Sequence, residues 1–264
     1  MFDLRQAAAG TVVVAAAAVV DVLEQPEAGI PLVTQLLMGW PAQVLGLEGD
    51  WFHIQAQDGS PGWARVENFC LPCWPTNTMT VQITRAAAPL FAASRSSAGS
   101  CGTLFLGSRL PLLDEDKDFL RVALPQGDSA LVRRQDAAVF YADQPVDQQQ
   151  IVSTAGLYLG ASYLWGGMTV QGIDCSGLTY MAYYANGIQL PRDAQDQYKA
   201  GVPVTDLIMG DLVFFSTIVP GPSHVGLYLE NGLFLNARTK EGVTVSSLSD
   251  GFFASRYLGA RRYL

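Results

Sequence analysis

The amino-terminal half of the chain repeats itself at a fixed distance, and this repeat limits its possible folds more than any other feature. Residues 37–39 (Leu-Met-Gly) match residues 105–107 (Phe-Leu-Gly), and residues 51–54 match residues 119–122, each at a distance of 68 residues. Each copy has short alternating runs separated by Gly, Pro and Asp turns, a pattern typical of small barrels. Two copies are too few for a solenoid, so we predict two small all-β barrels.

The composition indicates a folded globular protein and disfavours one class of partner. The 264 residues are 49% hydrophobic and 15% charged, which is enough for two or three compact domains without long disorder. A net charge of −8 disfavours nucleic acid, because phosphate binding needs clustered Lys and Arg. Four cysteines in a chain of this length are not a disulfide framework.

An apolar run near the start, Thr11–Val20, raises the question of a membrane or export signal. The run is too short to span a bilayer, and the residues before it include Asp3 and Arg5 where a signal peptide has a basic segment. We interpret the run as a first strand, predict no membrane span, and favour a cytoplasmic location. A periplasmic, tethered or exported form is the alternative.

A pair of cysteines, Cys70 and Cys73, lies at the seam between the two copies with two residues between them. Such spacing can hold zinc or support redox chemistry, but no second pair or nearby histidine accompanies it, so we predict no metal site. His53 lies in a predicted strand, and we assign it a structural role.

In the second half, a cysteine stands where a helix is predicted to begin. Residues 176–186 carry helical apolar spacing, and Gly187 is a typical helix stop. Cys175 therefore lies in the first turn, where the peptide dipoles favour an anion and hence the nucleophilic thiolate. The alternative is a small buried cysteine on an apolar helix.

The second of the two histidines, His224, offers the base that a cysteine nucleophile needs. Residues 224–229 and 233–238 read as two strands of a hairpin. A two-residue turn would place His224 and Asn236 on opposite faces, whereas a three-residue loop pairs Leu227 with Leu235 and places both polar residues on one face. The apolar matching favours the three-residue loop, which makes Cys175, His224 and Asn236 a nucleophile, base and orienting group.

These motifs resemble a known family. Tyr-Leu-Trp-Gly-Gly at 163–167, Gly-Ile-Asp-Cys-Ser-Gly-Leu at 172–178, and Ser-His-Val-Gly-Leu-Tyr at 223–228 are similar in order and spacing to the NlpC-type papain-like cysteine peptidases, bacterial enzymes that cut cell-wall peptides. The resemblance covers roughly residues 145–264. The family's third catalytic position is usually His, so Asn236 is a departure that alters the type of the triad.

The resemblance extends to the repeats and completes the predicted architecture. The first copy, with its Gly62-Trp63, resembles bacterial SH3-like domains, and the second resembles them more weakly because its Gly-Trp is missing. We predict barrel 1 at residues 1–76, barrel 2 at residues 77–140 and an α+β papain-like catalytic domain at residues 141–264. The last begins with a helix at about 146–159, and an antiparallel sheet follows the helices, including a strand at 207–216 that Gly210-Asp211 interrupts.

The resemblance also marks six residues around the site as candidates for substrate binding, each with a structural alternative: Asp174, Ser176, Trp165, Tyr163, Arg192 and Asp193. Asp174 can bind a substrate ammonium or cap the helix. Arg192, with Asp193 beside it, can bind a carboxylate or form a surface ion pair.

The other candidates have similar pairs of roles. Tyr163 can donate to the oxyanion or pack in the core, Trp165 is predicted to line the cleft, and Ser176 can contact substrate or occupy the helix start. The backbone amide of Cys175 is expected to help stabilise the oxyanion.

The implied activity is hydrolysis of the γ-D-glutamyl–diamino acid bond in short murein peptides with a free amino-terminal L-Ala, as in cell-wall recycling, without metal or cofactor. In relatives of this architecture the first barrel closes one end of the cleft, using a tyrosine. Residues 1–140 contain no tyrosine, so either Trp51, Trp63 or Trp74 substitutes for it or the selectivity differs. The alternatives are a murein-fragment-binding protein without turnover and an amidase or acyltransferase of the same superfamily. The sequence leaves the oligomeric state open.

Overall fold

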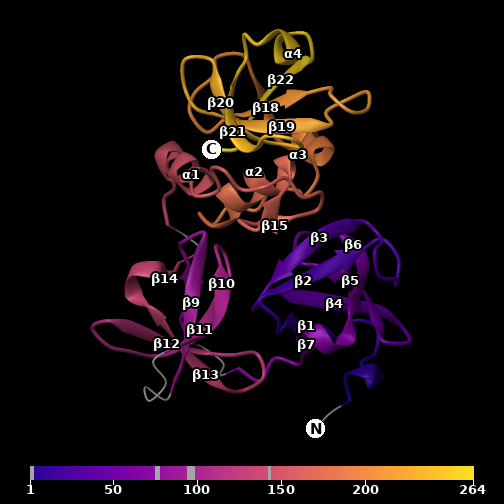
Figure 1. The fold of residues 1–264 in the computed structure, drawn as a ribbon, viewed down its shortest axis with the longest axis vertical. Coiled ribbons are helices and arrows are strands. Elements are labelled where there is room, and N and C mark those ends of the chain that lie inside the picture. The colour runs from indigo at the N-terminus through magenta and orange to yellow at the C-terminus, as the bar shows by residue number, and fades with distance from the viewer. Residues whose placement is uncertain (1–2, 75–77, 94–98, 142–143) are drawn as a thin grey trace. The chain divides into compact units, whose positions relative to one another are not determined.

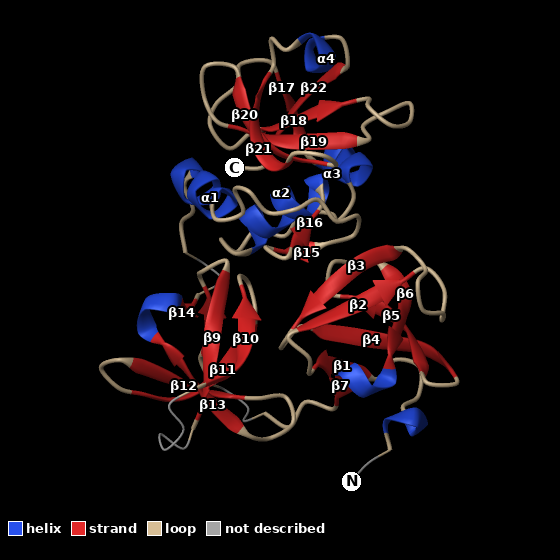
Figure 2. Cartoon of the chain, viewed as in Figure 1, coloured by secondary structure: helices blue, strands red, loops and turns tan. Residues whose placement is uncertain are grey.

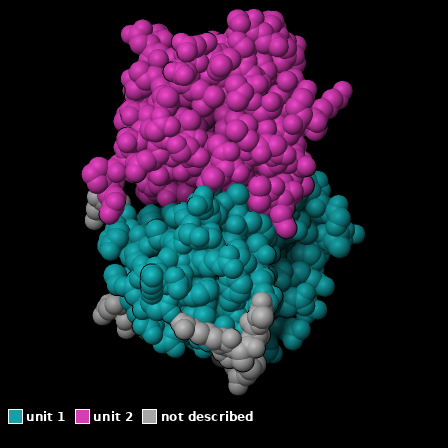
Figure 3. Space-filling view, turned by 60° about the vertical axis from the view of Figure 1, so that its left-hand side comes forward, with its two compact units in different colours: residues 1–142 teal, residues 143–264 magenta. Residues whose placement is uncertain are grey.

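The computed structural model describes residues 3–74, 78–93, 99–141 and 144–264. The chain divides into two compact units, Met1–Ala142 and Asp143–Leu264, which Figure 3 distinguishes by colour. Within the described residues, none of the helices is both long and apolar enough to cross a bilayer. The predicted domain boundaries at 76/77 and 140/141 remain predictions.

The first unit contains two seven-stranded antiparallel sheets, one from each sequence repeat (Figure 1). The first sheet has the order β3-β2-β6-β5-β4-β1-β7, with bounds β1 Val12–Ala15, β2 Val19–Leu23, β3 Leu32–Leu37, β4 Pro41–Glu48, β5 Trp51–Ala56, β6 Pro61–Arg65 and β7 Phe69–Cys70. The second has the order β10-β9-β13-β12-β11-β8-β14, with bounds β8 Thr80–Ile83, β9 Ala87–Ala92, β10 Ser100–Phe105, β11 Arg109–Glu115, β12 Phe119–Ala123, β13 Ser129–Arg133 and β14 Ala137–Phe140.

The two sheets confirm the sequence repeat, because each strand of the second occupies the position of its counterpart in the first. The short 3-10 helices η2 (Val66–Asn68) and η3 (Arg134–Asp136) also correspond at the repeat distance. A third, η1 (Leu4–Gln6), precedes the first sheet. The repeat thus encodes one all-β topology twice.

The apolar run Thr11–Val20 does not form the single strand that we predicted. It forms β1 and the beginning of β2, with a bend over residues 17–18. The reason lies in the sheet order: β1 pairs with β4 and β7, whereas β2 pairs with β3 and β6, so the chain must turn between them.

The two repeats contact each other through a buried tryptophan and a close backbone approach. The indole Nε1 of Trp40 donates to the Gly107 carbonyl at 2.9 Å, and Trp40 is 1% exposed. Next to it, Gly39 has φ +91°, and a Cβ there would lie 2.0 Å from the Arg109 carbonyl oxygen. A side chain at position 39 would therefore force the repeats apart. His53, predicted to be structural, stacks on Trp63 with ring centroids 4.8 Å apart.

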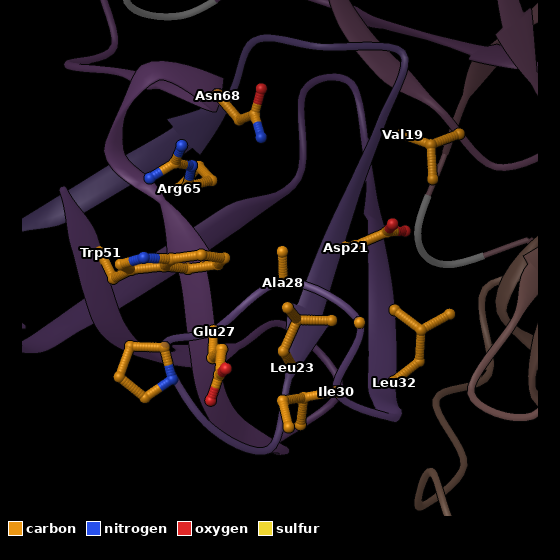
Figure 4. Close-up of a pocket in the computed structure, with 12 residues that line it drawn as sticks. Val19, Asp21, Leu23, Glu27, Ala28, Ile30, Leu32, Trp51, Arg65 and Asn68 are labelled. Atoms are coloured by element: carbon orange, nitrogen blue, oxygen red, sulfur yellow. The ribbon is translucent and has the colours of Figure 1, made fainter.

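The first repeat also holds a surface hollow of about 770 Å³, which Figure 4 shows in close-up. Trp51 and Arg65 lie on one side of it, with the guanidinium 4.8 Å from the indole centroid, and Asp21 lies on the other. Of the three tryptophans considered in place of a tyrosine, Trp51 lines this hollow, whereas Trp74 packs against the core of the second repeat.

The second unit is α+β, as predicted, with helices α1–α3 on one side of a sheet (Figure 2). The sheet order is β17-β22-β18-β19-β20-β21, and the bounds are β17 Val202–Val204, β18 Leu212–Phe215, β19 His224–Tyr228, β20 Leu233–Arg238, β21 Gly242–Ser247 and β22 Tyr257–Arg262. The helices are α1 Gln148–Gly156, α2 Cys175–Tyr184, α3 Ala194–Ala200 and α4 Gly251–Ala254, and a small hairpin pairs β15 Met168–Thr169 with β16 Gly172–Ile173.

Two elements are shorter than the sequence predicted. Helix α1 begins at Gln148, because Asp147 and Gln150 form a reciprocal capping box that fixes its first turn. Strand β18 covers only residues 212–215, since the Gly210-Asp211 pair belongs to the preceding turn. Helix α2 is buried along its whole length, which makes it a rigid support for its first residue.

Candidate active site

Cys175 is the first residue of α2 and is 7% exposed. The side chain of Asp174 caps this helix by accepting a hydrogen bond from the Gly177 amide at 2.6 Å. As the first helical residue, Cys175 has an amide without a partner inside the helix. The predicted helix start is therefore confirmed.

A buried ion pair lies at the same helix start. Arg192 donates from Nη2 to Asp174 Oδ2 at 2.8 Å and from Nη1 to Oδ1 at 3.1 Å, and the Arg192 and Asp174 side chains are 3% and 9% exposed. Oδ2 also accepts from the Gly166 amide at 2.8 Å. Because every oxygen of this carboxylate has partners, the observed contacts of Asp174 are structural: they join the 166–167 turn, α2 and the loop before α3.

Ser176 and Gln197 extend this network. The Ser176 hydroxyl accepts from Arg192 Nη1 at 2.9 Å, and its carbonyl accepts from Gln197 Nε2 at 3.1 Å. The Oε1 atom of Gln197, a fully buried residue, accepts from the Thr179 hydroxyl at 2.8 Å. These bonds hold α3 against the first turn of α2, so the position of Cys175 is fixed from several sides.

The glycine after the nucleophile motif allows a close backbone approach. A Cβ on Gly177 would lie 2.5 Å from the Gly167 carbonyl oxygen. Any side chain at Gly177 would therefore displace the first turn of α2, and with it Cys175.

The hairpin that carries the histidine has the register that the sequence predicted. Leu227 pairs with Leu235, and Gly232 has φ +77°, with a three-residue loop at 230–232. Asn231 also has a positive φ, of 52°, which the prediction did not include. In this register His224 Nε2 lies 3.0 Å from Asn236 Oδ1.

The surroundings of Asn236 determine which nitrogen of His224 carries the proton. Asn236 Nδ2 donates to the Thr244 carbonyl at 3.1 Å and to the Ser246 hydroxyl at 2.9 Å. Oδ1 must then be the acceptor that faces His224, so the imidazole carries its proton on Nε2. The other nitrogen, Nδ1, keeps its lone pair and can act as a base.

Aromatic rings surround the imidazole. Phe253 and Phe215 each have a ring centroid 6.0 Å from that of His224, and both phenylalanines are buried. Burial lowers the pKa of His224 below 6.5, while the Asn236 hydrogen bond opposes this shift. The histidine is therefore neutral at neutral pH, the form that its predicted role as a base requires.

The pKa of Cys175 is raised, whereas the position at a helix terminus predicted that it would be lowered. Burial raises the pKa of Cys175 to about 12, and Asp174 acts in the same direction. The backbone amides of Val225 and Ser176 and the charge of Arg192 lower it, but by less. Both shifts favour the neutral forms, a thiol at Cys175 and an imidazole at His224.

A cavity of about 390 Å³ opens at the two reactive groups. Its lining includes Cys175, His224 and Tyr163, then the turn at residues 238–241. The lining also includes apolar side chains from two further segments: Ile218, Phe252 and Phe253. Cys175 and His224, the predicted nucleophile and base, therefore line one substrate-sized space.

Comparison with known proteins identifies the class of this site. A gamma-D-glutamyl-L-lysine dipeptidyl-peptidase from Bacillus cereus (strain ATCC 10987 / NRS 248) is 31% identical over 252 residues, which cover 88% of this chain and 75% of that protein. The model of the NlpC/P60 family matches residues 160–262. The chain belongs to the NlpC/P60 family. Its second unit is therefore a cysteine peptidase domain, as the sequence motifs predicted.

Further matches extend the similarity to both units. The family model of the bacterial dipeptidyl-peptidase Sh3 domain matches residues 22–68, within the first repeat. A gamma-D-glutamyl-L-lysine dipeptidyl-peptidase from Bacillus subtilis (strain 168) is 32% identical over 243 residues, covering 87% of this chain and 80% of that protein. The crystal structure of an NlpC/P60 family protein from Bacillus cereus ATCC 10987 has a TM-score of 0.88 at 26% identity, covering 96% of this chain and all of that chain.

The remaining predicted residues of this NlpC/P60 domain lie in different surroundings. Tyr163 lines the catalytic cavity, and burial raises the pKa of its phenol, which keeps it a hydrogen-bond donor. Trp165 is 58% exposed and lies outside the lining of this cavity. Asp193 is exposed at the start of α3, where its side chain makes no capping bond to the helix.

Several residues of the site had no part in the sequence prediction. Thr244 and Ser246 hold Asn236, and their alternation with Val243 and Val245 in β21 was the signal that could have identified them. Gln197 has no such signal, because a glutamine in a polar helix is usually exposed. Arg238 and Glu241 line the cavity from a turn whose position became known only with the fold.

Proposed function

We propose that this protein is a cysteine peptidase that hydrolyses the γ-D-glutamyl–L-diamino acid bond of short murein peptides and releases the dipeptide L-Ala-γ-D-Glu. The observation that carries the proposal is the His224–Asn236 hydrogen bond, which leaves a basic nitrogen on the imidazole that shares a cavity with Cys175. The substrate class comes from the two dipeptidyl-peptidase relatives, whose names specify the γ-D-glutamyl-L-lysine bond.

The reaction follows from the resting protonation states. As Cys175 Sγ attacks the carbonyl carbon, its proton passes to His224 Nδ1, and the carbonyl oxygen becomes an oxyanion. The amide of Cys175 and the phenol of Tyr163 are the donors that we assign to that oxyanion. His224 then gives its proton to the departing amine, the carbon–nitrogen bond breaks, and a thioester remains.

The second half of the cycle releases the dipeptide. Water enters the site of the departed amine, His224 removes a proton from it, and the hydroxide attacks the thioester. The thiolate leaves and regains the proton from the imidazole, which restores the resting pair. Asn236 holds the imidazole in place through both halves of the reaction cycle. The proton on His224 Nε2 is never transferred.

The buried groups around Asp174 act as positioning residues in this proposal. Asp174, Ser176 and Arg192 hold the helix that presents Cys175. Because these three residues bond to one another, we assign the substrate contacts to the groups that line the cavity. We keep Trp165 and Asp193 as exposed candidates for contact with the acyl part of the substrate.

We also propose that the substrates are free peptides with an unblocked amino terminus and that the enzyme acts in the cytoplasm. A dipeptidyl-peptidase releases a dipeptide from the amino terminus of its substrate, so the terminal amine is part of what it recognises. Cys70, Cys73, Cys101 and Cys175 are all free, which suits a reducing compartment. Fractionation of cells carrying a tagged full-length protein tests the location; recovery outside the cytoplasm would refute it.

The experiment that tests the function compares L-Ala-γ-D-Glu-L-Lys with its N-acetylated form. We expect cleavage of the first between D-Glu and Lys and at least 100-fold slower cleavage of the second, because the blocked amine loses its charge-assisted contacts. Equal cleavage would refute the requirement for a free amino terminus. Binding of both peptides without products would instead support a murein-fragment-binding protein.

A further inference from the structure

The cavity that holds Cys175 and His224 also has two oppositely charged side chains in its lining. Arg238 is the last residue of β20, and Glu241 directly precedes β21, so the two lie at the start and end of the connection formed by residues 238–241. Arg238 Nη2 lies 3.5 Å from Glu241 Oε1, and the two side chains are 33% and 46% exposed. Both line the cavity together with the catalytic pair. A cation and an anion thus lie within the same space as the reacting atoms.

The two charged side chains lie on the side of the leaving group. His224 must deliver a proton to the departing amine, so that amine lies next to the imidazole. Residues 238–241 line the same cavity as His224, whereas Asp174, Ser176 and Arg192 are not among the described residues that line it. The part of the substrate that follows the cleaved bond therefore points toward Arg238 and Glu241.

Close packing and backbone hydrogen bonds fix the base of the 238–241 turn, which restricts the positions of its charged side chains. A Cβ on Gly242, which has φ +68°, would lie 2.3 Å from the Ala161 carbonyl oxygen. Two backbone bonds of 2.9 and 2.8 Å, Gly160 N to Val243 O and Val243 N to Ala161 O, join the start of β21 to the segment before Tyr163. The guanidinium of Arg238 also lies 5.4 Å from the centroid of the Phe253 ring. The base of the turn is therefore fixed to the wall of the site.

We propose that Arg238 and Glu241 form the leaving-group subsite, in which Arg238 binds the α-carboxylate of the diamino acid and Glu241 binds its side-chain ammonium. This inference rests on the proposed function, because only that function makes the leaving group a diamino acid. The pairing is chemically specific: a guanidinium matches a carboxylate, and a carboxylate matches an ammonium.

The surroundings suit an exchange of partners. The Arg238–Glu241 pair is long and partly exposed, and such pairs contribute little to stability. A zwitterionic residue can therefore enter between them at small cost and replace one loose contact by two. The exposed side chains of Ile218 and Phe252 provide apolar surface for the methylene chain of lysine. Lys240 adds a second positive charge to this lining.

The test uses three peptides that differ only in the leaving group: L-Ala-γ-D-Glu-L-Lys, its norleucine analogue, which lacks the side-chain ammonium, and its C-terminal amide. We expect the wild-type protein to prefer the lysine peptide over each analogue by about 10-fold or more in kcat/KM. Glu241→Gln should remove the preference over norleucine alone, and Arg238→Gln the preference over the amide alone. Arg238→Lys should restore part of the latter.

An exposed ion pair on α3 provides matched control variants. Lys199→Gln and Asp196→Asn remove the same charges from an exposed pair of 2.9 Å on α3, and both should leave all three rates unchanged. The subsite is refuted if the wild-type protein cleaves the three peptides equally, or if each variant slows all three to the same extent. If the wild-type protein cleaves none of them, the proposed function itself is wrong.

Discussion

His224 and Asn236 face each other across the β19–β20 hairpin, with Nε2 and Oδ1 3.0 Å apart. Asn236 is fully buried, and both hydrogens of its amide nitrogen have acceptors. Its carbonyl oxygen therefore has one orientation, and the imidazole has one tautomer. The change from the His expected by resemblance to Asn keeps an acceptor for the Nε2 proton.

Replacing Asn236 by alanine should lower kcat/KM by about 10- to 1,000-fold, because the imidazole loses the acceptor that sets its tautomer. Steady-state kinetics on the tripeptide measures the loss. Asn186→Ala is the matched control: its amide nitrogen donates to Thr154 and Ala182, away from the catalytic cavity, and activity should persist. Full activity of Asn236→Ala would exclude this residue from the triad.

Replacing Asn236 by histidine should be tolerated within about 10-fold, because one ring nitrogen can accept from His224 while the other donates to the Thr244 carbonyl. The comparison with Asn236→Ala in one assay decides the point. A histidine variant as inactive as the alanine variant would show that the amide geometry itself is required.

The pH dependence should follow the lowered pKa of His224. The neutral imidazole is the active form, and burial holds its pKa below 6.5, so the neutral form persists to lower pH than in an exposed histidine. We expect kcat/KM to fall only as the pH drops through a value below 6.5. A profile of kcat/KM between pH 4 and pH 8 checks this, and a half-maximum above pH 7 would contradict it.

The Asp174–Arg192 pair should be important for folding as well as for activity. Asp174→Asn leaves the buried Arg192 guanidinium without its bidentate partner, and we expect a loss of about 3–5 kcal/mol in the free energy of unfolding. Urea denaturation measures this loss. Adding Arg192→Met to the Asp174→Asn variant should recover part of the lost free energy of unfolding, because no unpaired charge then remains buried.

Lys199→Met is the control for the Asp174–Arg192 measurement. It breaks an exposed ion pair with Asp196 in the same unit, and the urea midpoint should hardly change. A midpoint for Asp174→Asn that matches this control would show that the buried pair contributes nothing particular.

The cysteines outside the site should be dispensable for turnover. Cys70 donates to the Pro125 carbonyl at 3.0 Å, and burial raises its pKa to about 11, which favours the neutral thiol. No group of three or more metal-ligating side chains occurs within the described part of the chain. Serine at Cys70, Cys73 or Cys101 should leave kcat/KM within about 3-fold, and a loss of activity on chelation or on these changes would revive a metal or redox role.

The sequence predicted best what depends on local patterns. The hairpin register followed from the matching of Leu227 with Leu235, and the start of α2 followed from the apolar spacing after Cys175. The repeat distance gave two copies of one all-β topology, since equal patterns at equal spacing fold alike.

What the sequence could not give depends on the tertiary fold. The raised pKa of Cys175 comes from its burial, which outweighs the helix terminus. The sequence did not predict the buried position of Arg192, because an arginine in a loop is usually exposed. Arg238 and Glu241 became part of the site only because β20 and β21 bring their turn to the cavity.

The most direct test of the central claim is mass spectrometry of L-Ala-γ-D-Glu-L-Lys after incubation with the wild-type protein and with Cys175→Ala. We predict L-Ala-γ-D-Glu and free L-Lys from the wild-type protein, and intact peptide from the variant, which should keep the wild-type fold by circular dichroism. An intact peptide with the wild-type protein, or the same products from the variant, would contradict the account.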